Sequence, residues 1–151
     1  MVFMFQDFAK VEKLITPVIN ALLDNDGKRG LCIVVLIGDK KASTEKALVW
    51  THRVNDYGKA ESIALAKAKT SWRTGHSTRA VSESAWLLAE KGDCLWPGAI
   101  VHDDHDIRVV VAVSGLTPRH DEYLALMTVN TIDLVSDDNA KGNMDGNGMV
   151  E

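Results

Sequence analysis

Apolar positions along the chain recur in blocks that predict two hairpins joined and covered by helices. The most regular block is Pro97–Val135, where a strand, a charged turn, a second strand and a helix follow one another. Residues Ile107–Ser114 (IRVVVAVS) are β-branched or apolar almost throughout, which is typical of a strand buried on both faces. The run His102–Asp106 (HDDHD) precedes it, and Asp favours reversals because its carboxylate bonds nearby backbone groups. We therefore predict a hairpin that turns at HDDHD.

A helix is predicted directly after this hairpin. Ser114 and Gly115 break the strand, Thr117 is a favourable N-cap, and Pro118 suits the first helical turn. Apolar side chains then recur at helical spacing as far as Val135. One face of this helix is therefore expected to cover the sheet.

The first half of the chain predicts the order helix, hairpin, helix. Apolar residues at three- and four-residue steps over Phe5–Leu22 indicate an amphipathic helix, and Pro17 predicts a kink or a second short helix there. Leu31–Ile37 (LCIVVLI) has the composition of a buried strand, and Ala47–Val54 that of its hairpin partner. Lys59–Arg73 predicts a helix with a stripe of small side chains, which allows close packing.

The remaining segments are less regular. Ser82–Lys91 is predicted as a short helix that turns Trp86 and Leu87 inward. The tail 136–151 (SDDNAKGNMDGNGMVE) has almost no apolar residues, so we predict it to be disordered. Short hairpin connections favour an antiparallel sheet, here of about five strands flanked by helices, in one α/β domain of the α+β type. That single domain is expected to span residues 1–135.

Composition limits the classes of partner that we expect and predicts the cellular compartment. The formal net charge of the 151 residues is −4, so bulk charge favours neither nucleic acid nor an anionic membrane. No apolar run approaches the ~20 residues of a membrane span, and the start lacks the order of a secretory signal. Cys32 and Cys94 have no sequence feature that pairs them, so reduced thiols are expected. We expect a cytoplasmic protein with no nucleic-acid or membrane partner.

Three segments, in order, resemble one known family. Ser62–Ser77 (SIALAKAKTSWRTGHS) is similar to the Ser-Ile-x-x-Ala-x-x-Lys-Ala-x-Thr-Ala helix of the GlcG/HbpS-like haem-degrading domain family, and its Gly-His-Ser ending to an uncharacterised branch. Pro97–Val101 (PGAIV) resembles that family's Gly-Gly-Val-Pro-Ile strand. Val111–Asp121 (VAVSGLTPRHD) resembles its Val-Ser-Gly segment with the acidic residues that follow. The chain departs from the pattern at Ala99 and Val101, and HDDHD replaces a short Asp-Gly turn.

The resemblance implies a profilin-like fold, an antiparallel sheet flanked by helices, and a ring-like homo-oligomer. Members of the family are linked to haem binding or breakdown, to glycolate or diol metabolism, or to chaperone pathways. The resemblance therefore implies a fold and an oligomeric habit more firmly than a reaction. It leaves open whether this chain is an enzyme.

The first candidate site is the run WRTGHS at 72–77, at the end of the predicted helix. Histidine can ligate a metal or transfer a proton, arginine can hold a carboxylate by two bonds, and tryptophan suits a flat organic ligand. Alternatively, Arg73 and His76 simply meet the free carbonyls of a helix C-terminus. With the resemblance, Trp72, Arg73, His76 and Ser77 become candidates for binding a small organic ligand such as haem, in a pocket completed by a neighbouring subunit.

Two further candidates have weaker support. His102, Asp104 and His105 carry side chains that bind divalent metals, but strand alternation would splay them. A solvated turn is the better interpretation, so we assign no metal. Ser114 and Gly115 lie where a strand meets a helix N-terminus, whose backbone N–H groups favour an anion. No base lies at a recognisable spacing from Ser114, which argues against a nucleophile.

Two hypotheses about function follow. The first is a cytoplasmic homo-oligomer that binds a small organic ligand. The alternative is a non-catalytic assembly or adaptor protein that presents a surface to a protein partner, because no acid, base or nucleophile constellation is recognisable. The resemblance also makes Asp121 the family's acidic residue, expected to hold the turn before the last helix, with His120 beside it at the surface.

Overall fold

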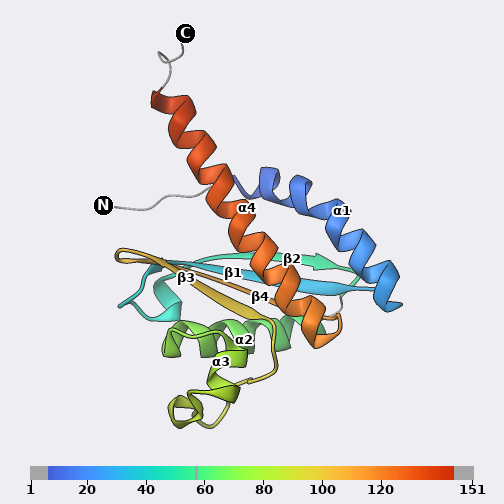
Figure 1. Cartoon of the computed structure of the whole chain (residues 1–151), viewed down its shortest axis with the longest axis vertical. Coiled ribbons are helices and arrows are strands. Elements are labelled where there is room, and N and C mark those ends of the chain that lie inside the picture. The colour runs from blue at the N-terminus through green and yellow to red at the C-terminus, as the bar shows by residue number, and fades with distance from the viewer. Residues whose placement is uncertain (1–6, 57, 145–151) are drawn as a thin grey trace.

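The computed structural model describes residues 7–56 and 58–144, with side chains as far as Asp137 (Figure 1). Helices alternate with two hairpins in the predicted order. The helices are α1 (Phe8–Asp26), α2 (Lys59–Thr74), α3 (Thr78–Glu83) and α4 (Pro118–Met144), with 3-10 turns η1 (Thr44–Lys46) and η2 (Trp86–Leu88). The strands are β1 (Leu31–Asp39), β2 (Leu48–Val54), β3 (Ala99–Asp104) and β4 (Ile107–Ser114).

The strands form one antiparallel sheet in the order β2-β1-β4-β3, so the two hairpins meet along β1 and β4. That central pairing runs from Cys32 opposite Ser114 to Asp39 opposite Ile107. The predicted α+β fold is confirmed. The described residues form four strands rather than about five, because 89–98, between η2 and β3, are turns and irregular backbone.

Helices cover both faces of the sheet, α1 and α4 on one face and α2 on the other (Figure 1). Side chains of a strand alternate between its faces. Ile33 and Val35 of β1 accordingly pack with the aliphatic residues of α1 and α4. Cys32 and Val34 pack with α2, whose small residues include Ala64. Burial raises the pKa of the Cys32 thiol to about 12, so this thiol is unreactive at neutral pH.

Helix α1 runs without a break through Pro17, so neither a second helix nor a helix end occurs there. Pro17 lies on the exposed side, where water can take the carbonyl that the missing N–H leaves free. The first residues of the predicted helix, 5–6, lie outside the described residues. Gly27 ends α1 in the left-handed conformation, at φ 64°.

The short helix falls earlier than predicted. The Ser77 hydroxyl accepts a hydrogen bond from the Ala80 N–H at 3.1 Å, so α3 starts at Thr78 and ends before the apolar residues that follow. Trp86 is 64% exposed and Leu87 80% exposed. The prediction that these two side chains face inward is therefore wrong.

Helix α4 continues past Val135 to Met144. Extending an existing helix needs no new nucleation, which explains why residues 136–144 remain helical despite their polar composition. The rest of the predicted disordered tail, 145–151, lies outside the described residues. Among the described helices, α4 included, none combines the length and the apolar content needed to cross a membrane.

Candidate functional site

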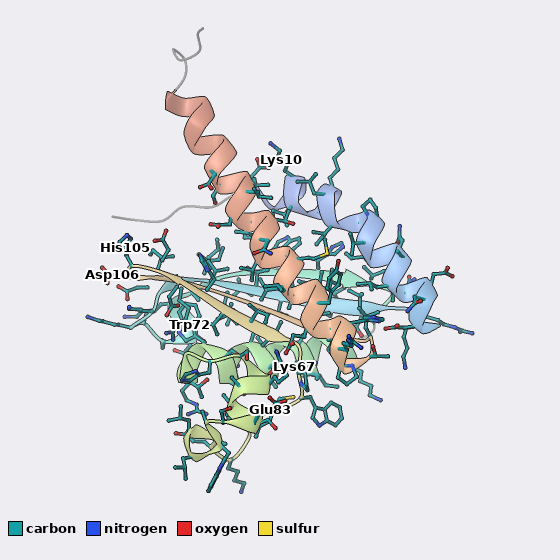
Figure 2. All side chains as sticks on the ribbon, in the orientation of Figure 1. Lys10, Lys67, Trp72, Glu83, His105 and Asp106 are labelled. Carbon is teal, nitrogen blue, oxygen red and sulfur yellow. The ribbon has the colours of Figure 1, made fainter. Side chains whose placement is uncertain are left out.

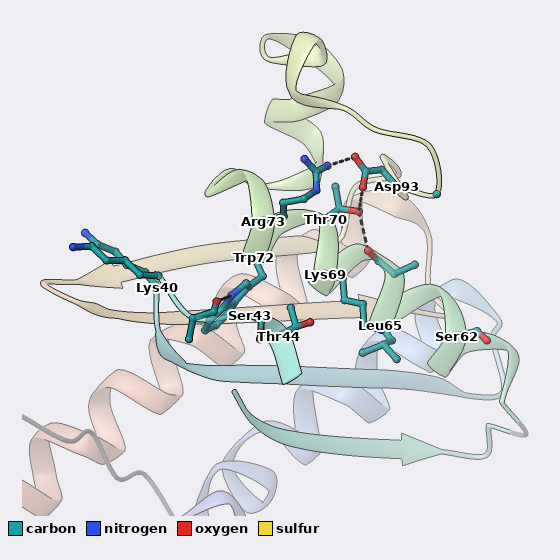
Figure 3. A pocket seen from close by; sticks show the side chains of 14 residues that line it. Lys40, Ser43, Thr44, Ser62, Leu65, Lys69, Thr70, Trp72, Arg73 and Asp93 are labelled. Carbon is teal, nitrogen blue, oxygen red and sulfur yellow. Dashed lines mark hydrogen bonds and ion pairs between the residues drawn. The ribbon is translucent and has the colours of Figure 1, made fainter. Parts of the chain in front are cut away.

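A pocket of about 630 Å³ lies between α2 and the loop that joins β1 to β2 (Figure 3). We call it the α2 pocket. Leu65 and Lys69 contribute to its helical wall, and residues 40–44 form the wall opposite. Gly92 and Asp93 close one side. Its volume lies within the range of small-molecule sites, so the pocket is large enough for an organic ligand.

Trp72 fixes the loop wall of this pocket. Its side chain is almost fully buried, and its indole Nε1–H donates to the Ala42 carbonyl at 2.8 Å. Its ring packs with the sheet residues Val34 and Leu36. Trp72 therefore lines the pocket mainly as a structural residue that ties α2 to the loop.

Arg73 fixes the third wall. Its Nη1 donates to the Leu88 carbonyl at 3.1 Å and lies 3.3 Å from Glu90 Oε1, while Nη2 pairs with Asp93 (Figure 3). The guanidinium is therefore already engaged by protein groups. In this arrangement Arg73 secures the loop 88–93 to the end of α2.

Three lysines leave the α2 pocket electrostatically positive. Within the described part of the chain, the ammonium groups of Lys40, Lys41 and Lys69 have neither a hydrogen-bond nor an ion-pair partner. Figure 3 shows Lys40 extending from the loop at the edge of the pocket. Asp93 is the only acid among the described lining residues, and Arg73 pairs with it. A locally positive pocket on a chain of net charge −4 favours an anionic ligand.

His76 and Ser77 lie beyond the end of α2 and do not line the pocket. Gly75 ends the helix at φ 74°, and its N–H donates to the Ser71 carbonyl. The His76 side chain is exposed, and its backbone N–H donates to Thr74 Oγ1 at 3.3 Å. The structure thus divides the WRTGHS run between the pocket and the helix end.

Ser114 and Gly115 lie at the far end of β4 from the pocket. Arg108, near the start of β4, donates to the Trp72 carbonyl at 2.6 Å, whereas Ser114 is roughly 20 Å further along an extended strand. Gly115 has φ 125°, and a Cβ there would lie 2.6 Å from the Gly30 carbonyl oxygen. The structure does not bring these two candidates together with Trp72 and Arg73.

Two carboxylates already accept the backbone N–H groups before α4. The Leu116 N–H donates to Asp121 Oδ1 at 2.9 Å, and the Thr117 N–H donates to Asp26 Oδ2 at 3.1 Å. The prediction that Asp121 holds this turn is confirmed. The N–H of Thr117, and then His120 at 2.6 Å, lower the pKa of Asp26. His120 is partly buried against α1 rather than fully at the surface.

A buried ion pair is the feature that sequence reasoning missed. Lys67 Nζ lies 3.2 Å from Asp121 Oδ2 and donates to the Val113 carbonyl at 2.8 Å. Both side chains are almost fully buried, and Figure 2 places Lys67 between α2 and the start of α4. A Cβ at Gly98 would lie 2.7 Å from Nζ, so glycine leaves the room that the lysine occupies. Lys67 lies on the same face of α2 as its stripe of small residues. This position was the one sequence feature that indicated a buried lysine.

Burial dominates the electrostatics of this pair. Loss of solvation raises the pKa of Asp121 to about 6, although the Lys67 charge and the Leu116 N–H both act in the opposite direction. The pair connects α2, on one face of the sheet, with α4, on the other face. It is a structural connection between α2 and α4 and does not line the α2 pocket.

The predicted hairpin reversal is confirmed, with its tip at His105 and Asp106 between β3 and β4 (Figure 2). His102 and Asp104 belong to β3 and are exposed, as is His105. Among the described residues, no three His, Cys, Asp or Glu side chains converge as a metal-binding group. These three residues therefore do not form a metal site in this chain alone.

No protein-family model matches the chain, and a search of curated proteins finds no match. Solved structures share its fold over most of its length. A PduOC:heme complex has a TM-score of 0.60 at 15% identity, covering 87% of this chain and 95% of that chain. HbpS has a TM-score of 0.57 at 16% identity, covering 85% and 90%. The protein ORFY of Klebsiella pneumoniae, described by family model DUF336, has a TM-score of 0.56 at 18% identity, covering 83% of each chain.

These likenesses confirm, at the level of fold, the resemblance to the GlcG/HbpS-like family. At such identities the likeness shows the fold alone, so the ligand has to be argued from this chain's own residues.

Proposed function

We propose that this chain is a small-ligand-binding protein that takes an organic anion in the α2 pocket, with haem or a related carboxylate-bearing molecule as the ligand class. The observation that carries the proposal is the positive charge of Lys40, Lys41 and Lys69 around a pocket of suitable size, since these ammonium groups make no hydrogen bond or ion pair within the described residues. The likeness in fold to a protein solved as a haem complex supports this ligand class.

The pocket fits the carboxylates of haem better than its iron. Haem iron is held in proteins by His, Cys, Met or Tyr side chains. The described residues that line the α2 pocket include none of these types. Lysine ammonium groups, in contrast, bind carboxylates as flexible point charges. The proposal therefore rests on recognition of the anionic groups, and it assigns no iron ligand within the pocket.

His76 is not part of the proposed pocket. Its imidazole is exposed beyond the end of α2, outside the pocket. A ligand shared with a neighbouring subunit would be needed for His76 and Ser77 to take part in binding. The proposed homo-oligomer and the role of these two residues are tested together below.

The experiment is a titration of the full chain with haem and, separately, with iron-free protoporphyrin, followed by absorbance and tryptophan fluorescence. If carboxylates lead recognition, the two affinities agree within about threefold, and Lys69→Glu weakens both about tenfold. Lys59→Glu is the matched control, because Lys59 lies on the same helix, is exposed and does not line the pocket.

Two results would contradict this mode of binding. If neither molecule binds the wild-type chain, the proposed ligand class is wrong. If His76→Ala weakens haem binding but leaves protoporphyrin unaffected, His76 holds the iron and recognition is led by the metal. Native mass spectrometry of the same samples reports whether the complex is an oligomer.

A second candidate function, a protein-binding assembly or adaptor surface, is favoured by one observation. Four large apolar side chains between α3 and β3 are exposed: Trp86, Leu87, Leu88 and Trp96. Figure 1 shows this segment projecting below α2, away from the sheet. Aromatic residues are enriched at protein interfaces, and apolar side chains gathered on one projection are typical of a contact surface.

The double substitution Trp86→Ser with Leu87→Ser tests this second function. If the projection contacts another subunit, the mass in solution falls to that of a monomer, as measured by light scattering after size exclusion. Leu134→Ser is the control, because Leu134 is also exposed but lies on α4. An unchanged mass would leave the projection without a role in self-assembly.

A further inference from the structure

A second hollow, of about 340 Å³, lies on the other face of the sheet, between the β3–β4 hairpin and α4. We call it the hairpin groove. Its floor is aliphatic and consists of Ile107 and Val109 from β4 with Val129 and Ile132 from α4. Three of these side chains are almost fully buried in the main core. The floor is therefore rigid and offers an apolar body a preformed surface.

Acidic side chains border this apolar floor on both sides. Asp104 and Asp106 contribute from the hairpin, and Asp133 and Asp137 contribute from α4. All four are exposed, and no Lys or Arg is among the described lining residues. The only ion pair that they make within the described chain is that of Asp104 with His105, at 3.6 Å. His102 and His105 also line the groove. The groove thus combines an apolar floor with a rim of four carboxylates and two histidines, and without Lys or Arg among the described lining residues.

This combination selects the chemistry of an occupant. A metal ion does not fit, because no three acidic or imidazole side chains converge among the described residues. An anion would be repelled by the rim, and a neutral apolar molecule would leave the carboxylates without a counter-charge. An organic cation with an apolar body satisfies both surfaces, because its body covers the floor while its charge lies between the two acidic walls.

We infer that the hairpin groove is a second binding site, which takes an organic amine with an apolar body, and that it is independent of the α2 pocket. The two hollows share no lining residue. An amine in the groove would contact both the hairpin and α4 and hold them together. The inference does not depend on the proposed function, since the ligand classes have opposite charge.

The test uses 4-phenylbutylamine as the probe, with the isosteric 4-phenylbutanol and 4-phenylbutyrate as comparison ligands. Methyl NMR signals of Val109, Val129 and Ile132 report binding at the floor. We expect saturable shifts with the amine, about tenfold weaker binding of the alcohol, and none with the carboxylate. Added salt is expected to weaken binding of the amine and leave the alcohol unaffected.

Substitutions of the acidic residues on the rim distinguish the contribution of charge to amine binding from that of shape. Asp133→Asn and Asp137→Asn are each expected to weaken amine binding about threefold, and the double variant about tenfold, with unchanged affinity for the alcohol. Glu83→Gln is the matched control, because Glu83 is an exposed acid on α3, on the other side of the sheet (Figure 2). These are exposed positions, so the variants are expected to fold normally.

Three outcomes would overturn the inference. Equal binding of amine and alcohol would mean that the rim charge is irrelevant. Full amine affinity in the double variant would place the amine elsewhere. A ligand-free chain that doubles its mass as the methyl signals shift with protein concentration would assign the groove to a second copy of the chain.

Discussion

The α2 pocket and the hairpin groove lie on opposite faces of one sheet and differ in charge and in construction. The pocket is bordered by Lys40, Lys41 and Lys69, whereas the groove is bordered by carboxylates that include Asp133 and Asp137. Each hollow is formed where a hairpin or loop faces a helix. The sheet between them keeps the two regions apart, so one small domain can offer surfaces of opposite charge.

The walls of the α2 pocket are held by polar contacts. Trp72 ties the β1–β2 loop to α2, and Arg73 ties the loop 88–93 to the end of the helix. The Thr70 hydroxyl accepts the Cys94 N–H at 3.1 Å in the same region. The core beneath contains small residues such as Ala64 and Ala68. Individual contacts of this kind can open without unfolding the domain.

The hairpin groove is held by aliphatic packing instead. Its floor belongs to the larger core, which α1 and α4 build from residues such as Ile15, Ile19 and Leu124. Opening this core would expose apolar surface along the whole sheet. The comparison teaches that the groove is a preformed surface, while the walls of the pocket can adjust to a ligand.

The largest effect is expected where the two faces are joined, at Lys67 and Asp121. Lys67→Met keeps a long side chain but leaves the buried Asp121 carboxylate without its ammonium group. Breaking a buried ion pair in this way lowers the free energy of unfolding by about 3–5 kcal/mol. Urea unfolding of the full chain measures this change.

The double variant Lys67→Met with Asp121→Asn supplies the control. Because no buried charge then remains, we expect it to recover most of the stability that Lys67→Met loses. If Lys67→Met alone changed the free energy of unfolding by less than about 1 kcal/mol, water would have to reach the carboxylate. The description of the pair as a closed connection would then be wrong.

The second effect is a pH dependence at the same connection. Burial raises the pKa of Asp121 to about 6, above its ordinary value of 3.8, so the folded chain binds a proton more readily than the unfolded chain. Between about pH 4 and 6 this group therefore makes the free energy of unfolding rise as pH falls. Urea unfolding at several pH values tests this direction.

Other carboxylates change the free energy of unfolding at pH values below this range. The N–H of Thr117 lowers the pKa of Asp26, and Arg108 lowers that of Asp103, so their contributions to stability are lost below about pH 4. Asp121→Asn should therefore abolish the rise between about pH 6 and 4 and leave the fall at lower pH. A wild-type stability that decreases steadily from pH 6 downward would contradict this assignment.

Much of the fold was predictable because local patterns and tertiary packing agree. The strand Ile107–Ser114 was predicted to the residue, since an almost continuous apolar run between turn signals has few alternatives. The short helix was misplaced because its start depends on the cap made by the Ser77 hydroxyl, whereas the apolar Trp86 and Leu87 suggested a buried helix. A single hydrogen bond decided the register there.

The candidate site was less predictable because it depends on contacts between distant segments. Trp72 and Arg73 were named from a local motif, yet their partners are Ala42 in one loop and Leu88 in another. Lys67 was overlooked because a lysine near a helix end suits the dipole, and only the fold shows Asp121 beside it. Composition and spacing do not identify such pairs.

The smallest effect is expected at Arg73, and it tests whether the walls of the pocket open locally. Arg73→Lys keeps the positive charge but removes the fork that binds Leu88, Glu90 and Asp93 together. Because this group is partly exposed, the free energy of unfolding should fall by less than about 1 kcal/mol. Hydrogen exchange of the Glu90 and Cys94 N–H groups should nevertheless become several-fold faster.

Arg79→Lys is the matched control, because Arg79 pairs with Glu122 outside the pocket and leaves the loop 88–93 untouched. Faster exchange in Arg73→Lys alone would locate the adjustable wall at this loop, with signals from the hairpin groove unchanged. If both variants or neither accelerated exchange at Glu90, the loop would open only with the whole domain. The free energy of opening would then be the same on both faces of the sheet. The polar contacts of the α2 pocket would resist opening as strongly as the aliphatic packing of the hairpin groove.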